Sequence, residues 1–296
     1  MTETFQFLGI KWVDGVPKFM VARADNTLEY LDIPKKINLI KTDKKRCVGY
    51  YDLAQRQYMP CSARVDFSGT DMSQCTKCRD ANGFGMCLGC NGDSCRADNP
   101  LGRAFCCQEH LVYLAAFPSR FKVGTAAGYR GLKRMYEQGA LVSVFFAKTP
   151  DGRTARQIEQ AVSDLGISKN INTSYKMNNL IFKTDISDVR RELMQKLNEI
   201  RPKISENFAQ YFIEPQVNIF TDIHQGLFDC IAGTKLADLF GTSEICTKDY
   251  RKVSDAIEIS GNVKSIVGGL LVTLQDSGLS VINMKNWEGF EIKLEI

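Results

Sequence analysis

The distribution of cysteine is the feature that most constrains the fold of this chain. Nine of its eleven cysteines lie between Cys47 and Cys107. The segment that holds them, residues 41–107, is rich in Gly, Asp and Asn and has little periodic apolar pattern. Because such a segment cannot bury a conventional core, bound ligands must hold it together. We therefore predict a metal-binding module over residues 41–107.

The N-terminal sequence favours metal ligands over disulfides. Met1 to Phe5 lack the basic region and apolar run of a signal peptide, and no stretch reaches the ~18 apolar residues of a membrane helix. Without export the compartment is reducing, and clustered cysteines there bind metal more often than they form disulfides. We expect a cytoplasmic protein that does not associate with a membrane.

Two C-x-x-C turns, Cys75–Cys78 and Cys87–Cys90, each place two thiolates on one ion. The further candidate ligands are Cys47, Cys61, Cys95, Cys106, Cys107 and His110. Ten candidates suit two four-coordinate sites with two residues left over, so we predict one or two structural zinc ions. An iron–sulfur cluster needs the same four thiolates and is the alternative.

Spacing alone leaves the pairing of these ligands open, because two sites can interleave. One assignment couples Cys75 and Cys78 with Cys106 and His110. It leaves a second set of Cys87, Cys90 and Cys95 with Cys61 or Cys47. Cys230 and Cys246 lie far along the chain and are expected to be buried small hydrophobes. His224 has no evident ligand partner and is expected to make only a local hydrogen bond.

Apolar periodicity predicts an α+β chain with small β units at both ends. Residues 1–40 show a β-meander, with hairpin signals at Asp14-Gly15 and Asp25-Asn26. Residues 213–296 show the same pattern of short apolar runs separated by turn residues, and we predict that the two ends share one barrel. Between them, residues 181–212 carry an amphipathic helix over 187–200 that ends at Pro202.

Residues 108–180 alternate strands and helices. The pattern predicts strands at 111–117 and 120–125, then a helix at 128–138. An apolar strand at 141–147 and a helix at 153–165 follow. We therefore predict a three-stranded sheet covered by helices.

Basic residues concentrate in the same region. Between Ser119 and Arg156 only Glu137 and Asp151 oppose eight bases. A locally basic stretch suggests an anionic ligand, of which a DNA or RNA backbone is the commonest. A solvated face without a partner is the other interpretation. The candidate nucleic-acid contacts are Arg120, Arg130, Lys133, Arg153 and Arg156.

This region resembles the GIY-YIG nuclease superfamily, whose motif lies on a β-hairpin followed by helix, strand and helix. Leu111-Val112-Tyr113 stands at the first motif and keeps the tyrosine but not the glycine. Lys122-Val123-Gly124 stands at the second and keeps the glycine, with lysine where tyrosine is usual. Arg134 fits the helix arginine better than Arg130, and Glu159 fits the glutamate of the second helix. Asn170 or Asn172 stands near the superfamily's late asparagine.

The resemblance implies hydrolysis of a phosphodiester bond by a divalent-metal-dependent endonuclease. Tyr113 would act as general base or orient the water, and Glu159 would hold Mg²⁺ or Mn²⁺. Arg134 would clamp phosphate oxygens with its planar fork, and Lys122 would add a second positive charge. Each residue also has a plainer reading: Tyr113 as a packed strand aromatic, and Glu159 as an ion-pair partner of Arg156.

The chain also resembles a prokaryotic family of unknown function, which places a cysteine-rich segment before this domain. The matching residues are Cys47 to Tyr50, Cys61, Cys75, Cys78, His110, Tyr113, Lys122 to Gly124 and Gln138 to Ala140. That resemblance brings no activity with it. The alternatives to an endonuclease are a non-catalytic DNA- or RNA-binding module, and an iron–sulfur or scaffold protein.

Overall fold

The computed structural model describes residues 2–87, 89–97, 99–180, 185–220, 250–253, 257–275 and 278–295. These form two compact units: unit 1 comprises Met1–Gly85 and Lys248–Ile296, and unit 2 comprises Met86–Thr247. Helices and strands mix in the described chain, as the α+β prediction requires. His224, Cys230 and Cys246 lie outside the described residues. None of the described helices is long and apolar enough to cross a membrane.

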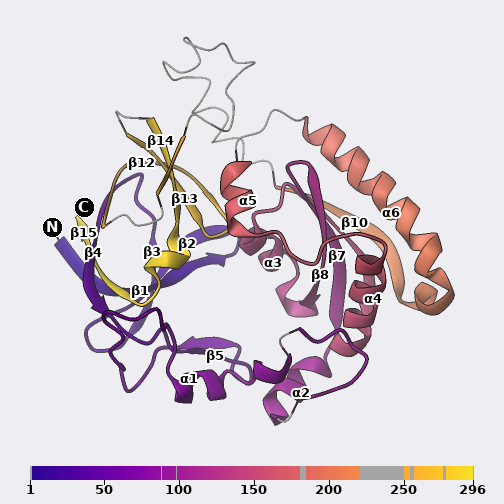
Figure 1. Cartoon of the computed structure of the whole chain (residues 1–296), viewed down its shortest axis with the longest axis horizontal. Coiled ribbons are helices and arrows are strands. Elements are labelled where there is room, and N and C mark those ends of the chain that lie inside the picture. Colours follow the sequence, from indigo (N-terminus) through magenta and orange to yellow (C-terminus); the bar gives the residue numbers. More distant parts are fainter. Residues whose placement is uncertain are drawn as a thin grey trace. The chain divides into compact units, whose positions relative to one another are not determined.

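Unit 1 is built on one sheet, to which both ends of the chain contribute (Figure 1). In the described chain it has nine strands in the order β11-β14-β13-β12-β4-β15-β1-β2-β3. From the N-terminal part come β1 (Thr2–Val13), β2 (Val16–Ala22), β3 (Leu28–Asp32) and β4 (Lys36–Lys45). From the C-terminal part come β11 (Tyr250–Val253), β12 (Glu258–Val267), β13 (Leu270–Gln275), β14 (Gly278–Asn283) and β15 (Phe290–Glu295). All neighbours are antiparallel except β11 and β14.

The ends of the chain interleave within this sheet. β4 lies between β12 and β15, and β15 pairs with β1. The β1–β2 turn is Asp14-Gly15, with φ of 49° and 79°, which suits the twist of a two-residue hairpin. The buried Trp12 donates its indole N–H to the carbonyl of Gly268 at 3.1 Å. The two ends thus share one sheet, but not the predicted barrel, because no pairing among the described strands joins β3 to β11.

Unit 2 contains a second sheet with strand order β10-β9-β7-β8. Its strands are β7 (His110–Phe117), β8 (Arg120–Ala127), β9 (Val142–Thr149) and β10 (Phe212–Ile219). Its helices are α2 (Pro100–Cys106), α3 (Gly131–Gln138), α4 (Gly152–Asp164), α5 (Thr173–Asn178) and α6 (Ile186–Phe208). The sheet is larger than the predicted three strands, because β10 pairs antiparallel with β9 from across the intervening helices.

Helices cover both faces of this sheet (Figure 1). One face packs Val112, Leu114 and Phe146 against α4 and α6. The other packs Tyr113, Ala115 and Phe145 around Met135 of α3. Since both faces are covered, β7 is a nearly continuous apolar run rather than an alternating one.

Helix α6 does not end where the sequence predicts. It continues through Pro202 to Phe208, one and a half turns further. Ile200 and Ile204 are both buried in the core beneath the helix, so the apolar stripe continues past the proline. Burial of that stripe outweighs the loss of one backbone hydrogen bond at Pro202.

A close approach between neighbouring strands fixes the β7–β8 hairpin. Tyr113 and Gly124 are directly opposite each other in the ladder. A Cβ atom at Gly124 would lie 2.4 Å from the Tyr113 hydroxyl and 2.5 Å from its Cζ. The glycine therefore provides the space in which the buried phenol lies across the neighbouring strand.

We predict that Gly124→Ala lowers the free energy of unfolding by about 1–3 kcal/mol, since the new methyl group overpacks the site. Tyr113→Phe in the same chain should recover part of this loss, because it removes the nearest clashing atom. Gly269→Ala is the control, with no atom within 4 Å of its Cβ position. Denaturant unfolding measures all four proteins, and an unchanged Gly124→Ala stability would contradict the packing argument.

Candidate functional site

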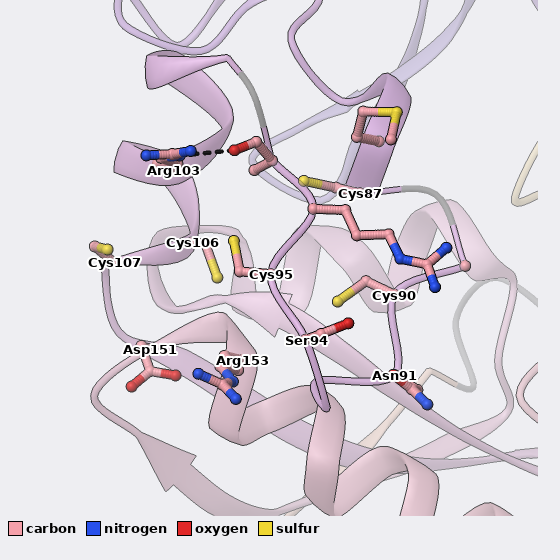
Figure 2. A pocket seen from close by; sticks show the side chains of 14 residues that line it. Cys87, Cys90, Asn91, Ser94, Cys95, Arg103, Cys106, Cys107, Asp151 and Arg153 are labelled. Carbon is pink, nitrogen blue, oxygen red and sulfur yellow. Dashed lines mark hydrogen bonds between the residues drawn. The ribbon is translucent and has the colours of Figure 1, made fainter.

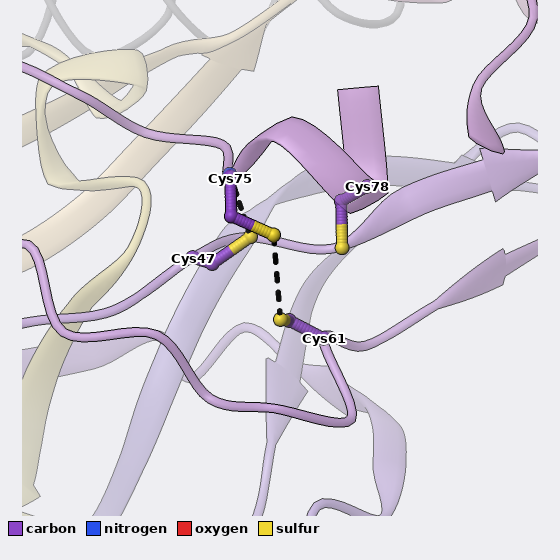
Figure 3. Close-up of side chains that lie close together, drawn as sticks. All are labelled: Cys47, Cys61, Cys75 and Cys78. Carbon is purple, nitrogen blue, oxygen red and sulfur yellow. Dashed lines mark hydrogen bonds between the residues drawn. The ribbon is translucent and has the colours of Figure 1, made fainter. Parts of the chain in front are cut away.

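Four cysteines of unit 1 bring their sulfur atoms together (Figure 3). The Sγ atoms of Cys47, Cys61, Cys75 and Cys78 all lie within 4.8 Å of one another, and all four residues are buried. The Sγ atoms of Cys61 and Cys75 are 3.9 Å apart. Four thiolates at ~2.3 Å from one zinc ion have sulfur separations of about 3.8 Å. The cluster therefore fits a single tetrahedral ion.

Different elements supply these ligands. Cys47 follows β4, and Cys61 follows the short hairpin of β5 (Tyr50–Asp52) and β6 (Gln57–Met59). Cys75 precedes α1 (Thr76–Ala81), and Cys78 lies on it. Gly49 has φ of 85°, and a Cβ there would lie 2.1 Å from the carbonyl oxygen of Met59. Only glycine allows the chain to turn back beneath the Cys47 sulfur.

Backbone N–H groups surround the Cys47 sulfur. Cys75 donates its N–H to the Cys47 Sγ at 3.2 Å, and Gly49 donates at 3.5 Å. These donors stabilise a thiolate, as the metal-bound form requires. Gln6 of β1 anchors the same turn by donating to the carbonyls of Arg46 and Cys47, both at 3.1 Å. The centre is thus tied to the large sheet.

The pKa values of three of the thiols shift in different directions. Burial raises the pKa of Cys47 and of Cys78, since the charged form loses solvation. Burial acts the same way on Cys61, but hydrogen bonds from the Val65 N–H and from Cys47 and Cys78 outweigh it and lower its pKa to about 7. Of these three thiols, Cys61 is the most acidic, and a bound cation would compensate the charge of further thiolates.

The observed grouping corrects the predicted pairing. Cys75 and Cys78 are joined by Cys47 and Cys61, not by Cys106 and His110. The two C-x-x-C turns fall in different units, since Cys78 belongs to unit 1 and Cys87 to unit 2. The prediction failed because the turn at Gly49 and the β5–β6 hairpin, not sequence proximity, bring Cys47 and Cys61 to the first turn.

His110 begins β7 and is buried. Its Nδ1 lies 2.8 Å from the carbonyl oxygen of Gln108. Burial lowers the pKa of the imidazole, which favours the neutral ring. A Cβ at Gly152 would lie 3.1 Å from the His110 Nε2 and 3.3 Å from the Cys106 Sγ. Cys106 and His110, which were predicted to act together, therefore both lie against the start of α4.

The four residues of the predicted catalytic group come close together in unit 2. Tyr113 and Lys122 lie on the same face of the β7–β8 hairpin, and Arg134 comes from α3, on that face. Glu159 comes from α4, which packs on the other face. The charges of Arg134 and Glu159 nevertheless reach both Tyr113 and Lys122 and shift their pKa values. We refer to these four residues, with Gln138 and Lys176, as the cationic site.

Positive charge dominates the cationic site. Lys122 is 7% exposed and donates from Nζ to the Gln138 Oε1 at 2.9 Å. Burial, followed by the charges of Arg134 and Lys176, lowers the pKa of Lys122 to about 8. Burial and Arg134 likewise lower the pKa of Lys176 to about 8. The folded chain therefore keeps several cations close together at a free-energy cost.

Tyr113 and Glu159 are both buried here. Tyr113 is 1% exposed and packs edge-on against Phe145 at 6.1 Å between ring centroids. Burial raises the pKa of its phenol, and the positive charge of Arg134 opposes this only in part. Glu159 is 5% exposed and pairs with Arg156 at 3.2 Å. Tyr113 is thus a neutral hydroxyl, and Glu159 is a carboxylate already facing one cation.

Sequence analysis did not identify Gln138 and Lys176 as site residues. Lys176 lies on α5, donates to the backbone carbonyl of Gln138 at 2.8 Å and lies over the ring of Phe117. No local pattern marks this lysine, because its place depends on packing of α5 against the sheet. Asn172 caps α5 by accepting from the Tyr175 N–H at 2.7 Å, and Asn170 is exposed.

The predicted nucleic-acid contacts divide into two groups. Arg153 donates to the carbonyls of Gly92 and Asp93, so it is engaged within the protein. Arg156 faces Glu159, and Arg130 pairs with Glu137 at 2.5 Å. Lys133 is exposed on α3, and Arg120 is exposed with its guanidinium over the Tyr175 ring at 4.1 Å. Lys133 and Arg120 therefore offer the more accessible charges beside the cationic site.

We predict that Cys78→Ser removes bound metal from unit 1 and lowers its stability. The substituted hydroxyl is a poor ligand, and few apolar side chains other than Phe67 join the four cysteines in that core cluster. Metal content by elemental analysis and thermal unfolding measure the effect. Lys77→Ala, an exposed position within the same C-x-x-C turn, is the matched control and should change neither. A metal content in Cys78→Ser equal to that of the wild type would rule out this centre.

We predict that Lys122→Met stabilises the chain at pH 7. The lowered pKa means that the fold disfavours the charged amine by about 3 kcal/mol, which the substitution would recover. Loss of the hydrogen bond to Gln138 would cost about 1 kcal/mol. The net gain should be about 2 kcal/mol.

The pH dependence provides a second readout. Between pH 8 and 10.5 the unfolded chain binds a proton that folded Lys122 does not, so wild-type stability rises with pH. The advantage of Lys122→Met should shrink across that window. Lys133→Met, at an exposed lysine, should show neither effect. Denaturant unfolding at each pH measures this, and a loss of stability at pH 7 would contradict it.

Comparison with known proteins identifies the family. No curated protein and no solved structure matches the chain significantly. A family model described as "Protein of unknown function (DUF2797)" matches residues 34–292. The matched range runs from before β4 into β15, and so includes the four-cysteine centre and the cationic site. The chain therefore belongs to the DUF2797 family.

Proposed function

We propose that this chain binds nucleic acid at the cationic site and hydrolyses a phosphodiester bond there with a divalent cation. The observation that carries the proposal is that Lys122 and Lys176 both donate to Gln138, at 2.9 and 2.8 Å, beside Arg134. The charge of Arg134 acts on both lysines, and its side chain also bonds the buried hydroxyl of Tyr113. Two carboxylates face these three cations, and each also pairs with a further arginine: Glu137 lies 3.6 Å from Arg134 and pairs with Arg130, and Glu159 pairs with Arg156. An anion with several oxygens is the ligand that such a site fits best.

Electrostatics supports an anionic ligand. Lys122 is buried and Lys176 is half-buried, so both lose hydration, and the neighbouring charge of Arg134 repels both; the pKa of each lysine therefore falls. A phosphate group would reverse both effects, because it attracts all three charges and accepts their hydrogen bonds. Lys133 and Arg120 would extend the positive surface along a polymer backbone.

The order of the elements supports a GIY-YIG-like site. Strands β7 and β8, helix α3, strand β9 and helix α4 follow one another in the order that the resemblance implies. Tyr113 lies on the first strand, Lys122 on the second, Arg134 on the first helix and Glu159 on the second. The added strand β10 pairs with β9, at the edge of the sheet away from β8.

Each residue has a role that its environment favours. Tyr113, as a neutral hydroxyl with a raised pKa, would orient a water molecule rather than act as general base. Arg134 would clamp phosphate oxygens with its planar fork. Glu159 offers one carboxylate to Mg²⁺ or Mn²⁺, which keep several waters and also bind phosphate. Because cations surround Glu159, the metal ion would bind together with the phosphate rather than before it.

We further propose that the four-cysteine centre holds zinc. The 3.9 Å separation of the Cys61 and Cys75 sulfurs suits one ion. An iron–sulfur cluster would hold its thiolates further apart, because several iron and sulfide atoms lie between them. A closed four-thiolate shell leaves no open position, so the ion would be structural.

The test of the catalytic proposal uses single- and double-stranded DNA and RNA with Mg²⁺ or Mn²⁺. Glu159→Gln should lower cleavage by at least about 100-fold while leaving nucleic-acid binding intact. Asp164→Asn, exposed at the end of the same helix, is the matched control and should cleave like the wild type. Equal cleavage by Glu159→Gln would disprove the assignment of Glu159.

A non-catalytic nucleic-acid-binding module is the second candidate. The ion pair of Glu159 with Arg156 and the burial of Tyr113 favour it, since both groups are already satisfied within the protein. Its signature in the same experiment is binding that weakens steeply with salt, without cleavage under either metal. Loss of binding in Arg134→Ala would then assign the contact to the cationic site.

A further inference from the structure

Residues 86–107 form a segment of unit 2 that has almost no apolar core. Of its described residues only Gly92, Ala97 and Gly102 are buried, and none has a large side chain. Five cysteines fall in the same stretch. A segment of this kind gains too little from apolar burial to fix its conformation. Something other than hydrophobic packing must hold it.

Part of that support comes from α4. Arg153 donates from Nε to the Gly92 carbonyl at 2.8 Å and from a terminal nitrogen to the Asp93 carbonyl at 2.7 Å. Gln157 adds a hydrogen bond to the same Gly92 carbonyl at 3.3 Å. Gly92 has φ of 90°, and a Cβ there would lie 2.6 Å from the Arg153 carbonyl oxygen. The loop is therefore pressed against the first turn of α4.

A cavity of about 660 Å³ lies between this loop and α2. Cys87, Cys90, Cys95 and Cys106 line it, and Figure 2 shows their sulfurs directed toward the same space. Cys107 also borders the cavity, but its side chain points away from the other four (Figure 2). The first two belong to a C-x-x-C turn, closed by a hydrogen bond from the Cys90 N–H to the Cys87 carbonyl at 3.3 Å.

Cys106 is the most firmly placed of the four. It ends α2, and its sulfur lies against the start of α4, where a Cβ at Gly152 would be 3.3 Å away. The Arg153 backbone N–H donates to the same sulfur. This hydrogen bond favours the thiolate, but burial and the charge of Asp151 outweigh it and raise the pKa of Cys106, so a bound cation would be needed to hold the sulfur as a thiolate. Cys106 thus offers a fixed ligand opposite the more exposed loop.

The charges around the cavity fit a thiolate-bound dication. Four thiolates and one divalent ion carry a net charge of −2. Arg96, Arg103 and Arg153 all line the cavity, opposed there by Asp151. Arg103 also donates to the Ala97 carbonyl at 2.7 Å, which holds the loop beside α2. The surplus of positive charge compensates a metal–thiolate group better than it would a neutral ligand.

We propose that Cys87, Cys90, Cys95 and Cys106 form a second metal centre, of the zinc type, in unit 2. The C-x-x-C turn and Cys95 close onto Cys106, and the metal replaces the missing apolar core of residues 86–107. This centre uses no ligand of the four-cysteine centre in unit 1, and it does not depend on the proposed nucleic-acid function. The interpretation pairs Cys106 with the second C-x-x-C turn rather than with the first.

Zinc content of the intact chain tests the proposal. The wild type should bind two ions, Cys106→Ser should bind one, and the adjacent Cys107→Ser should still bind two. Cys78→Ser should bind one, and Cys78→Ser/Cys106→Ser none. Elemental analysis of purified protein gives these numbers without any nucleic acid. No ion in Cys78→Ser would overturn the second centre. Two ions in Cys106→Ser would overturn its ligand set, whether or not Cys107→Ser loses one.

A second measurement separates ligand loss from general unfolding. Trypsin cleaves after Arg96 and Arg103, which are both exposed in the segment. Added Zn²⁺ should slow this cleavage in Cys78→Ser, which keeps only the second centre, and should not slow it in Cys78→Ser/Cys106→Ser. Equal protection of both proteins by Zn²⁺ would mean that Cys106 is not a ligand.

Discussion

The four buried thiols of unit 1 are the constraint on which the segment from Cys47 to Cys78 depends. Between β4 and α1 the chain has two short strands and few buried apolar side chains, so its own packing cannot specify one conformation. Four sulfurs within 4.8 Å of one another could replace that packing with directional bonds to a metal ion. Gln6 links this segment to β1, because its side chain donates hydrogen bonds to the carbonyls of Arg46 and Cys47.

The cationic site differs from the four-cysteine centre, because its charged groups lie beside a well-packed apolar core rather than in place of one. Placing charge there lowers the stability of the fold. The depressed pKa of Lys122 measures that cost, since the folded state disfavours the charged amine. Gly124 has no side chain, which leaves room for both the ring and the hydroxyl of Tyr113. Such concessions are typical of sites built for a ligand.

Local sequence patterns predicted the parts of the fold that local forces determine. The strands and helices from His110 to Asp164 follow the predicted ranges closely, because their apolar residues repeat at strand and helix periods. Non-local contacts decided the rest. β10 joins β9 only after α6 has crossed the sheet, and α6 passes Pro202 because Ile204 is buried in the core. No local pattern groups Cys47 with Cys78, or places Lys176 beside Arg134.

In the proposed function, charge balance would also set the order in which phosphate and metal ion bind at the cationic site. Glu159 pairs with Arg156, and its charge also interacts with that of Lys122, so a free divalent cation would meet more repulsion than attraction there. A phosphate group changes that balance, because its oxygens offset the cations and offer the metal further ligands. Nucleic acid would therefore bring the metal ion with it. Glu159 pairs with Arg156 in the empty site. It would become a metal ligand only when the phosphate oxygens of the substrate attract Arg156 in its place.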